Sequence, residues 1–164
     1  MRMRGPFLAG EACPGRDTDV PMHAHLVRCE NCGRRNRPPA AAAGFPRCRN
    51  CHRLLPWIVD ADDDSFAEIA EGAAIPALVV IWTPWCPACS RVSPALQQLG
   101  LHLAGQVKLV MVNVVEAPRL QARFTVEAVP TLMLLRGPRI VAYQAGTPPE
   151  PSLRAWLDRA LGKA

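Results

Sequence analysis

Hydrophobic residues follow two different patterns along the chain, and the pattern changes near residue 54. After that position, short continuous apolar runs alternate with stretches of helical periodicity. Continuous runs are typical of strands buried on both faces of a sheet, and apolar residues three or four apart are typical of helices. The predicted strands are 55–60, 77–82, 107–114, 131–135 and 140–144, and the predicted helices are 62–74, 86–103, 116–124 and 152–161. This order predicts an α/β fold with a mixed central sheet flanked by helices.

The first third of the chain follows neither pattern. Residues 1–26 are rich in glycine, proline and charge, so we expect a disordered tail in which Met22 is a possible start. Residues 27–53 hold two Cys-x-x-Cys pairs joined by a stretch rich in arginine, proline and alanine, which predicts a small module with a surface loop. We expect a larger domain to follow at residues 55–162.

Charge is distributed unevenly between these parts. The formal net charge is +5 at pH 7. Residues 1–58 hold ten arginines and four acidic residues, whereas residues 59–164 hold nine basic and ten acidic residues. Because the larger domain is close to neutral, the sequence argues against a nucleic-acid-binding groove on it. One alternative remains open, in which the basic module docks a protein or an RNA.

No segment predicts export or membrane insertion. Only residues 6–10 follow the basic start before Glu11, whereas a signal peptide needs about 7–15 apolar residues. The longest apolar run, residues 75–82, is far shorter than the roughly 20 residues of a membrane span. We therefore expect a cytoplasmic protein, where reducing conditions disfavour structural disulfides, and we interpret the cysteines as metal ligands or redox centres.

The Cys-Pro-Ala-Cys motif at residues 86–89 stands where a predicted buried strand gives way to a helix. Unpaired N–H groups and the positive dipole end of a helix N-terminus stabilise a thiolate, and such motifs lower the thiol pKa from about 8.5 to roughly 3.5–7.5. We expect Cys86 to attack and Cys89, one turn later, to be the buried resolving thiol. The alternatives are a pair of core cysteines or half of a metal site.

A second cysteine signal lies in the N-terminal module. The two Cys-x-x-Cys pairs are separated by fifteen residues, a spacing typical of structural zinc sites in which two turns complete a tetrahedron of thiolates. All four ligand positions are filled, so we expect one closed, structural Zn²⁺ site of zinc-ribbon type. Redox-active disulfides are the alternative. The predicted ligands are Cys29, Cys32, Cys48 and Cys51.

Residues 55–162 resemble thioredoxins along their whole length. The resemblance is carried by Ile-Trp-Thr-Pro-Trp-Cys-Pro-Ala-Cys at 81–89, Pro94, Val-Pro-Thr at 129–131, and Gly146. It implies a thioredoxin fold and a cis peptide bond between Val129 and Pro130, packed against the active disulfide. It also implies that the backbone there and Trp85 form a substrate-docking surface. With the tetracysteine module, residues 27–162 resemble the zinc-containing thioredoxin-2 type of bacteria.

This resemblance implies reduction of protein disulfides, with electrons from a thioredoxin-reductase-type flavoprotein, and a link to oxidative stress. Two departures from the family stand out. Pro87 and Ala88 replace the usual Gly-Pro, which leaves the redox potential open and keeps a more oxidising isomerase or oxidase as an alternative. Val80 and Met111 replace the usual buried Asp and nearby Lys, so the proton acceptor expected for Cys89 is absent. We therefore expect slow, strongly pH-dependent resolution.

Overall fold

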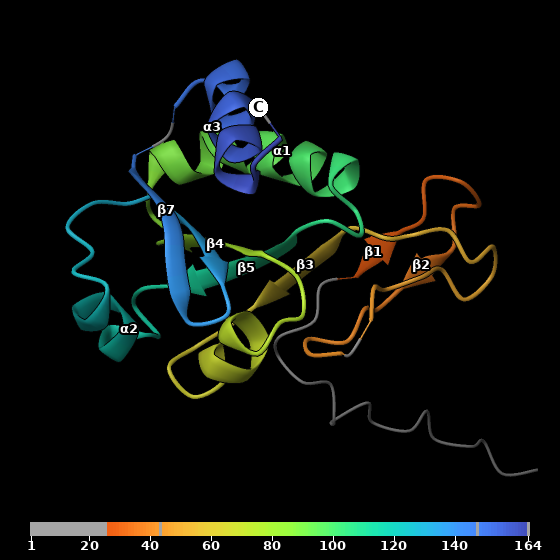
Figure 1. The fold of residues 1–164 in the computed structure, drawn as a ribbon, viewed down its shortest axis with the longest axis horizontal. Helices are drawn as coiled ribbons and strands as arrows, with labels where there is room; N and C mark the ends of the chain where they lie inside the picture. The colour runs from red at the N-terminus through yellow and green to blue at the C-terminus, as the bar shows by residue number, and fades with distance from the viewer. Residues whose placement is uncertain (1–25, 43, 147, 164) are drawn as a thin grey trace, which may run out of the picture.

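A five-stranded mixed sheet forms the centre of the structure, a computed structural model that describes residues 26–42, 44–146 and 148–163 (Figure 1). The strands are β3 (Trp57–Asp60), β4 (Ala77–Trp82), β5 (Lys108–Asn113), β6 (Thr131–Arg136) and β7 (Arg139–Ala145). Their order across the sheet is β3-β5-β4-β6-β7. The first three run parallel, β6 runs antiparallel to β4, and β7 runs antiparallel to β6. The predicted mixed sheet is therefore confirmed.

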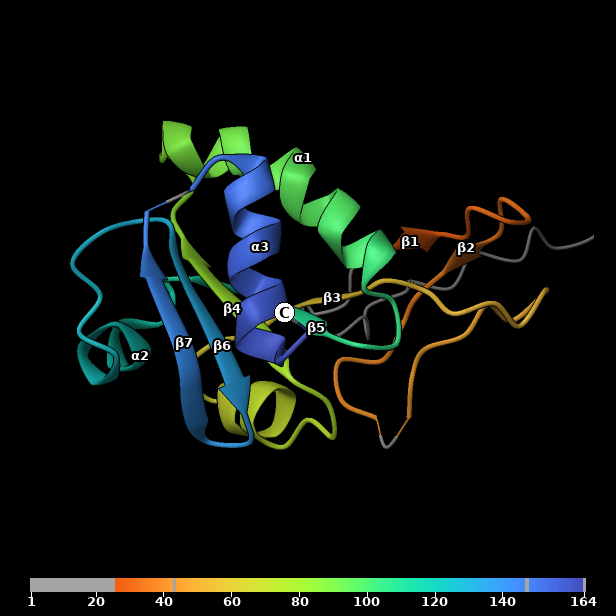
Figure 2. The same ribbon diagram turned by 45° about the horizontal axis from the view of Figure 1, so that its top comes forward.

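Helices cover both faces of this sheet. They are η1 (Ala67–Glu71), α1 (Pro87–His102), α2 (Pro118–Arg123) and α3 (Glu150–Leu161). Helices α1 and α3 lie on one face, and η1 and α2 lie on the other (Figures 1 and 2). Alternate residues of β4 enter the two layers: Leu78 and Val80 pack under α1, whereas Val79 and Ile81 pack under η1. Among the described residues, no helix is long and apolar enough to cross a membrane.

The helix predicted at 62–74 is shorter than expected, because a turn at 62–65 precedes it and Gly72 caps its C-terminal end. The Asp62 carboxylate accepts hydrogen bonds from the backbone N–H groups of Asp64 (3.1 Å) and Ser65 (2.9 Å), which form a turn. Asp63 instead caps a different helix, because its carboxylate accepts the N–H groups of Arg119 (2.9 Å) and Leu120 (2.8 Å) at the start of α2. The acidic run therefore links the turn before η1 to the start of α2, on the same face of the sheet.

The cysteine module, residues 27–53, lies at the far end of the sheet, beside the C-terminal end of α1 (Figure 2). Strands β1 (Val27–Arg28) and β2 (Arg35–Asn36) pair antiparallel within it. A small core joins the module to the segment before β3. Its buried members are Val27, Cys29, Cys48 and Leu55. The predicted tail at 1–26 lies outside the described residues except for Leu26.

The segment between the two cysteine pairs is anchored to the sheet, although the sequence predicts a free surface loop. The indole N–H of Trp57 donates to the carbonyl of Pro39 at 2.8 Å. Lys108, which is 1% exposed, donates from Nζ to the carbonyls of Ala40 and Ile69. The Lys108 ammonium also lies 4.4 Å from the centroid of the Trp57 ring, a cation–π contact. A buried charge therefore ties the module to the central sheet and to η1.

The buried Lys108 gives a prediction for stability. Desolvation lowers the pKa of its ammonium to about 8, against the opposing charge of Glu68. An unfolded lysine titrates near 10.4, so between these pH values the unfolded chain binds more protons than the folded chain. We predict that the unfolding free energy of the wild type, minus that of Lys108→Met, rises by roughly 1–3 kcal/mol from pH 8 to 10.5.

Urea denaturation at several pH values measures this difference. The exposed Lys163 is the chain's other lysine, and Lys163→Met should show no such slope. A flat or falling difference for Lys108→Met would contradict the prediction. It would mean that the carbonyls of Ala40 and Ile69 keep the folded ammonium as charged as it is in water.

Candidate functional site

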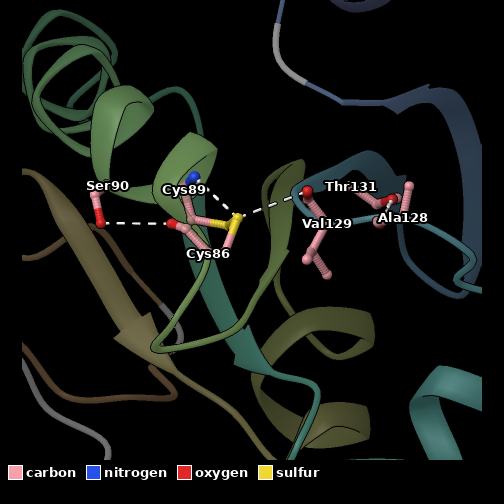
Figure 3. Close-up of a disulfide and its surroundings, with 6 residues drawn as sticks. All are labelled: Cys86, Cys89, Ser90, Ala128, Val129 and Thr131. Carbon is pink, nitrogen blue, oxygen red and sulfur yellow. Dashed lines mark hydrogen bonds between the residues drawn. A yellow bond between two sulfur atoms is a disulfide. The ribbon is translucent and has the colours of Figure 1, made fainter.

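A disulfide between Cys86 and Cys89 lies at the N-terminus of α1 (Figure 3). The two Cα atoms are 5.2 Å apart, and Cys86 is the residue that caps the helix. The backbone N–H of Cys89 donates to Cys86 Sγ at 3.1 Å. Pro87 occupies the first turn, where a missing N–H costs the helix nothing. The strand-to-helix context predicted for this motif is confirmed.

The electrostatic surroundings favour a thiolate at Cys86 once the disulfide is reduced. Its sulfur already receives one backbone N–H, and the positive end of the α1 dipole adds to this effect. The first turn of α1 holds no acidic residue that would oppose a negative charge. Both sulfur-bearing residues are buried in the disulfide form, with Cys86 7% and Cys89 8% exposed. Helix position, rather than burial, therefore distinguishes the two cysteines.

The loop before β6 lies directly against this disulfide. The Val129–Pro130 peptide bond is cis, as the resemblance to thioredoxins implies, and the Val129 carbonyl oxygen lies 3.6 Å from Cys86 Sγ (Figure 3). The N–H of Gly146 donates to the Pro130 carbonyl at 2.8 Å, which fixes this loop to the end of β7. Trp85, just before the first cysteine, is 72% exposed. The structure thus brings together the disulfide, the predicted docking loop and an exposed aromatic side chain.

A cavity of about 260 Å³ lies behind the disulfide, on the α1 face of the sheet. Cys89, Val80 and Met111 all line it, so the residues that replace the usual Asp and Lys share a cavity with the second cysteine. A carboxylate that the sequence analysis did not single out, that of Asp60, lines the same cavity. Its sequence signal is its place at the end of a predicted strand, two residues after Ile58, which packs under α1.

The four cysteines of the module converge on one point. All four Sγ atoms lie within 4.8 Å of one another, and the pairs Cys29–Cys51 and Cys32–Cys48 are 3.5 Å apart. None of the four forms a disulfide. Each pair forms the same turn, in which the carbonyl of the first cysteine accepts the N–H of the fourth residue after it. That residue is left-handed in both turns: Gly33 has φ 72° and His52 has φ 60°.

This donor set fits a tetrahedral thiolate site for zinc. Zinc–thiolate bonds of about 2.3 Å place the sulfurs of such a site roughly 3.8 Å apart, close to the spacing here. Hydrogen bonds from the backbone of Cys51, and then of Asn50, lower the pKa of Cys48 to about 6, against the effect of burial. Cys29 differs: a backbone hydrogen bond from Cys32 favours its thiolate, yet burial and the neighbouring Cys51 raise its pKa to about 11. Four adjacent thiolates therefore need a cation.

The redox motif and the cysteine cluster lie at opposite ends of α1 (Figure 1). Residues near the C-terminal end of that helix border the cluster, whereas the disulfide caps its N-terminus. Sixteen helical residues span about 24 Å. Direct exchange between the two groups of sulfurs would thus need a large rearrangement, and each site is best understood separately.

Known proteins align with this chain over about 100 residues or over a longer stretch. Thioredoxin from Haemophilus influenzae is 32% identical over 104 residues, which cover 63% of this chain and 97% of the relative. Thioredoxin C-3 from Corynebacterium nephridii is 30% identical over 139 residues, which cover 83% of this chain and 95% of the relative. The second alignment is longer than residues 57–164, so it reaches into the cysteine module.

A third relative matches over about the length of the larger domain. Thioredoxin from Allochromatium vinosum is 36% identical over 101 residues, which cover 62% of this chain and 94% of the relative. The family model described as Thioredoxin matches residues 57–159, which include the whole five-stranded sheet and the disulfide. This chain belongs to the thioredoxin family.

Proposed function

We propose that this chain reduces disulfide bonds in other proteins, using Cys86 and Cys89 as its redox pair. The observation that carries the proposal is the disulfide at the N-terminus of α1, set against the carbonyl of Val129. Membership of the thioredoxin family supports thiol–disulfide exchange as the chemistry. In this proposal Cys86 is the nucleophile and Cys89 the resolving thiol.

Each turnover then moves two electrons to the substrate. The Cys86 thiolate, stabilised by the N–H of Cys89, attacks one sulfur of a substrate disulfide and forms a mixed disulfide. The other substrate sulfur leaves as a thiolate and takes up a proton. Cys89 loses its proton and attacks Cys86 Sγ, so the Cys86–Cys89 bond forms and the bond to the substrate breaks. The substrate leaves as a dithiol, and the Cys86–Cys89 pair is left oxidised.

A substrate segment would dock in extended form beside the disulfide. The backbone of Val129 and Pro130 borders Cys86, and exposed Trp85 supplies an apolar surface next to it. Backbone pairing would give affinity without reading the substrate sequence closely, which suits an enzyme that acts on many proteins. A thioredoxin-reductase-type flavoprotein would return the disulfide to the dithiol, and a reducing compartment such as the cytoplasm suits this cycle.

We also propose that the module binds one structural Zn²⁺ through its four cysteines, as in zinc-containing thioredoxins. The convergence of the four sulfurs within 4.8 Å supports this. The ion would hold the two turns together and would take no part in electron transfer. The chain would then comprise a zinc module at 27–53 and a thioredoxin domain at 55–162.

A second candidate function is a more oxidising isomerase or oxidase. The residues between the cysteines motivate it, because Pro87 and Ala88 alter the surroundings of the thiolate and so the redox potential. A third candidate is a redox-switched adaptor, in which the module docks a protein or an RNA. Insulin reduction separates the adaptor from both enzymes, since an adaptor would not depend on Cys86.

We predict that Cys89→Ser traps mixed disulfides with substrate proteins, because the attacking thiol remains and the resolving thiol is missing. Cys86→Ser should trap none. Non-reducing gels of each variant, run after incubation with oxidised protein substrates, measure the mixed disulfides. Dithiothreitol should release the trapped substrates from these adducts. Equal trapping by both variants would contradict the assignment of roles, and trapping by Cys86→Ser alone would reverse it.

We predict that Cys48→Ser, which removes one ligand, releases zinc and loosens residues 27–53. Metal analysis of anaerobically purified protein should give one zinc per chain for the wild type and far less for the variant. Cys89→Ser is the matched control, because it removes a thiol from the redox pair and should keep the metal. Insulin reduction should persist in Cys48→Ser, because the larger domain has its own core. A wild type without zinc would contradict the prediction.

A further inference from the structure

The resolving step requires a base near Cys89, and the usual position for one holds Val80. That residue is 1% exposed and lines the cavity behind the disulfide. The sheet register shows what else lies on this face. Val80 pairs with Met111 on β5, and Met111 pairs with Asp60 on β3. Paired residues in a sheet share a face, so Asp60 lies on the same side as Val80, two strands away.

The cavity connects these positions. It is lined by Asp60 and Cys89 and has a volume of about 260 Å³, enough for several water molecules. Strands are about 4.8 Å apart, so the Cα atoms of Asp60 and Val80 are separated by roughly 10 Å. A short carboxylate at that distance needs water to reach the sulfur. Trp82 also lines the cavity, and its buried indole N–H has no acceptor among the described residues.

We propose that Asp60 is the proton acceptor for Cys89 and acts through water in this cavity. The proposal rests on the proposed disulfide reductase activity. In the mixed disulfide, the Cys89 thiol passes its proton through water to the Asp60 carboxylate, and the resulting thiolate attacks Cys86 Sγ. The substrate sulfur leaves with the electron pair of the broken S–S bond. The proton on Asp60 then returns to solvent or to the departing sulfur.

Apart from Asp60 and the cysteine itself, the described residues that line the cavity carry no titratable side chain. Strands β4 and β5 face the cavity with Val80, Trp82 and Met111, and helix α1 faces it with Cys89 and uncharged residues. From the cysteine module, Arg28 lines an adjoining cavity that shares Met111 and Ser93 with this one.

The test compares the pH dependence of single-turnover insulin reduction by pre-reduced wild type, Asp60→Asn and Asp60→Glu. We expect Asp60→Asn to be slower at pH 7 by roughly 10- to 100-fold, the low end of what a positioned base contributes. The deficit should shrink as pH rises and hydroxide takes the proton. Asp60→Glu keeps the carboxylate and should retain a profile close to the wild type. Asp158→Asn removes a carboxylate paired with Arg154 on α3 and should change nothing.

A second variant keeps the proposal testable if Asp60→Asn folds poorly. Val80→Asp places a carboxylate beside Cys89 directly. If Asp60 is already the proton acceptor for Cys89, adding Val80→Asp raises the wild-type rate by less than about twofold at pH 7. In the Asp60→Asn background, Val80→Asp restores the rate. Melting temperatures of all variants accompany the rates, because a buried carboxylate at position 80 carries a desolvation cost.

Three results would overturn the proposal. The first is a wild-type pH profile for Asp60→Asn. The second is an equal loss at every pH for Asp60→Asn and Asp60→Glu, which indicates a structural role. The third is a large acceleration of the wild type by Val80→Asp, which shows that Cys89 has no base. Failure of the proposed reductase activity gives a different result from failure of the Asp60 role. In that case Cys86→Ser and the wild type would reduce insulin at the same rate.

Discussion

The junction between β4 and α1 is the constraint on which the candidate redox centre depends. Strand β4 is buried on both faces, so its position is fixed by two separate hydrophobic layers. The chain leaves it at Trp82 and begins helix α1 at Pro87, with Cys86 as the cap. That placement gives the cysteine sulfur a backbone N–H and the positive end of a helix dipole. The reactivity proposed for Cys86 therefore originates in the packing of a strand.

The same strand fixes the other half of the site. Strand β6 pairs with β4 from Thr131 onward, which places the preceding cis-proline loop against the disulfide. On the far side, β5 and β3 bring Met111 and Asp60 into register with Val80. The candidate docking loop, the redox pair and the proposed proton acceptor thus hold their positions through the hydrogen-bonded ladders of one sheet.

The sequence predicted these central elements closely because their signals are local. The apolar run at 77–82 matches β4 residue for residue, and Pro130, Cys86 and Cys89 stand where the family pattern puts them. The helix predicted at 62–74 was too long, because Asp62 bonds to its own turn and Asp63 caps α2. Propensity along the chain does not reveal a partner more than fifty residues away.

Two other features depended on contacts across the sheet. In the sequence, Lys108 is a polar residue at the start of a buried strand. Only the packed structure shows that its ammonium contacts the Trp57 ring and donates to the carbonyl of Ala40. Asp60 reads as a strand end, and its approach to the cavity near Cys89 follows from the register of β3 with β5. A buried polar residue needs partners, but its sequence neighbours do not identify them.

Net reduction of protein disulfides is tested most directly by the redox potential of the Cys86–Cys89 pair in equilibrium with glutathione. A net reductant needs a disulfide that is stable relative to its dithiol, so we expect a value nearer the roughly −270 mV of reducing thioredoxins than the −120 mV of strong oxidants. A potential close to about −120 mV would contradict the account, because the chain would then take electrons from cellular thiols and act as an oxidase.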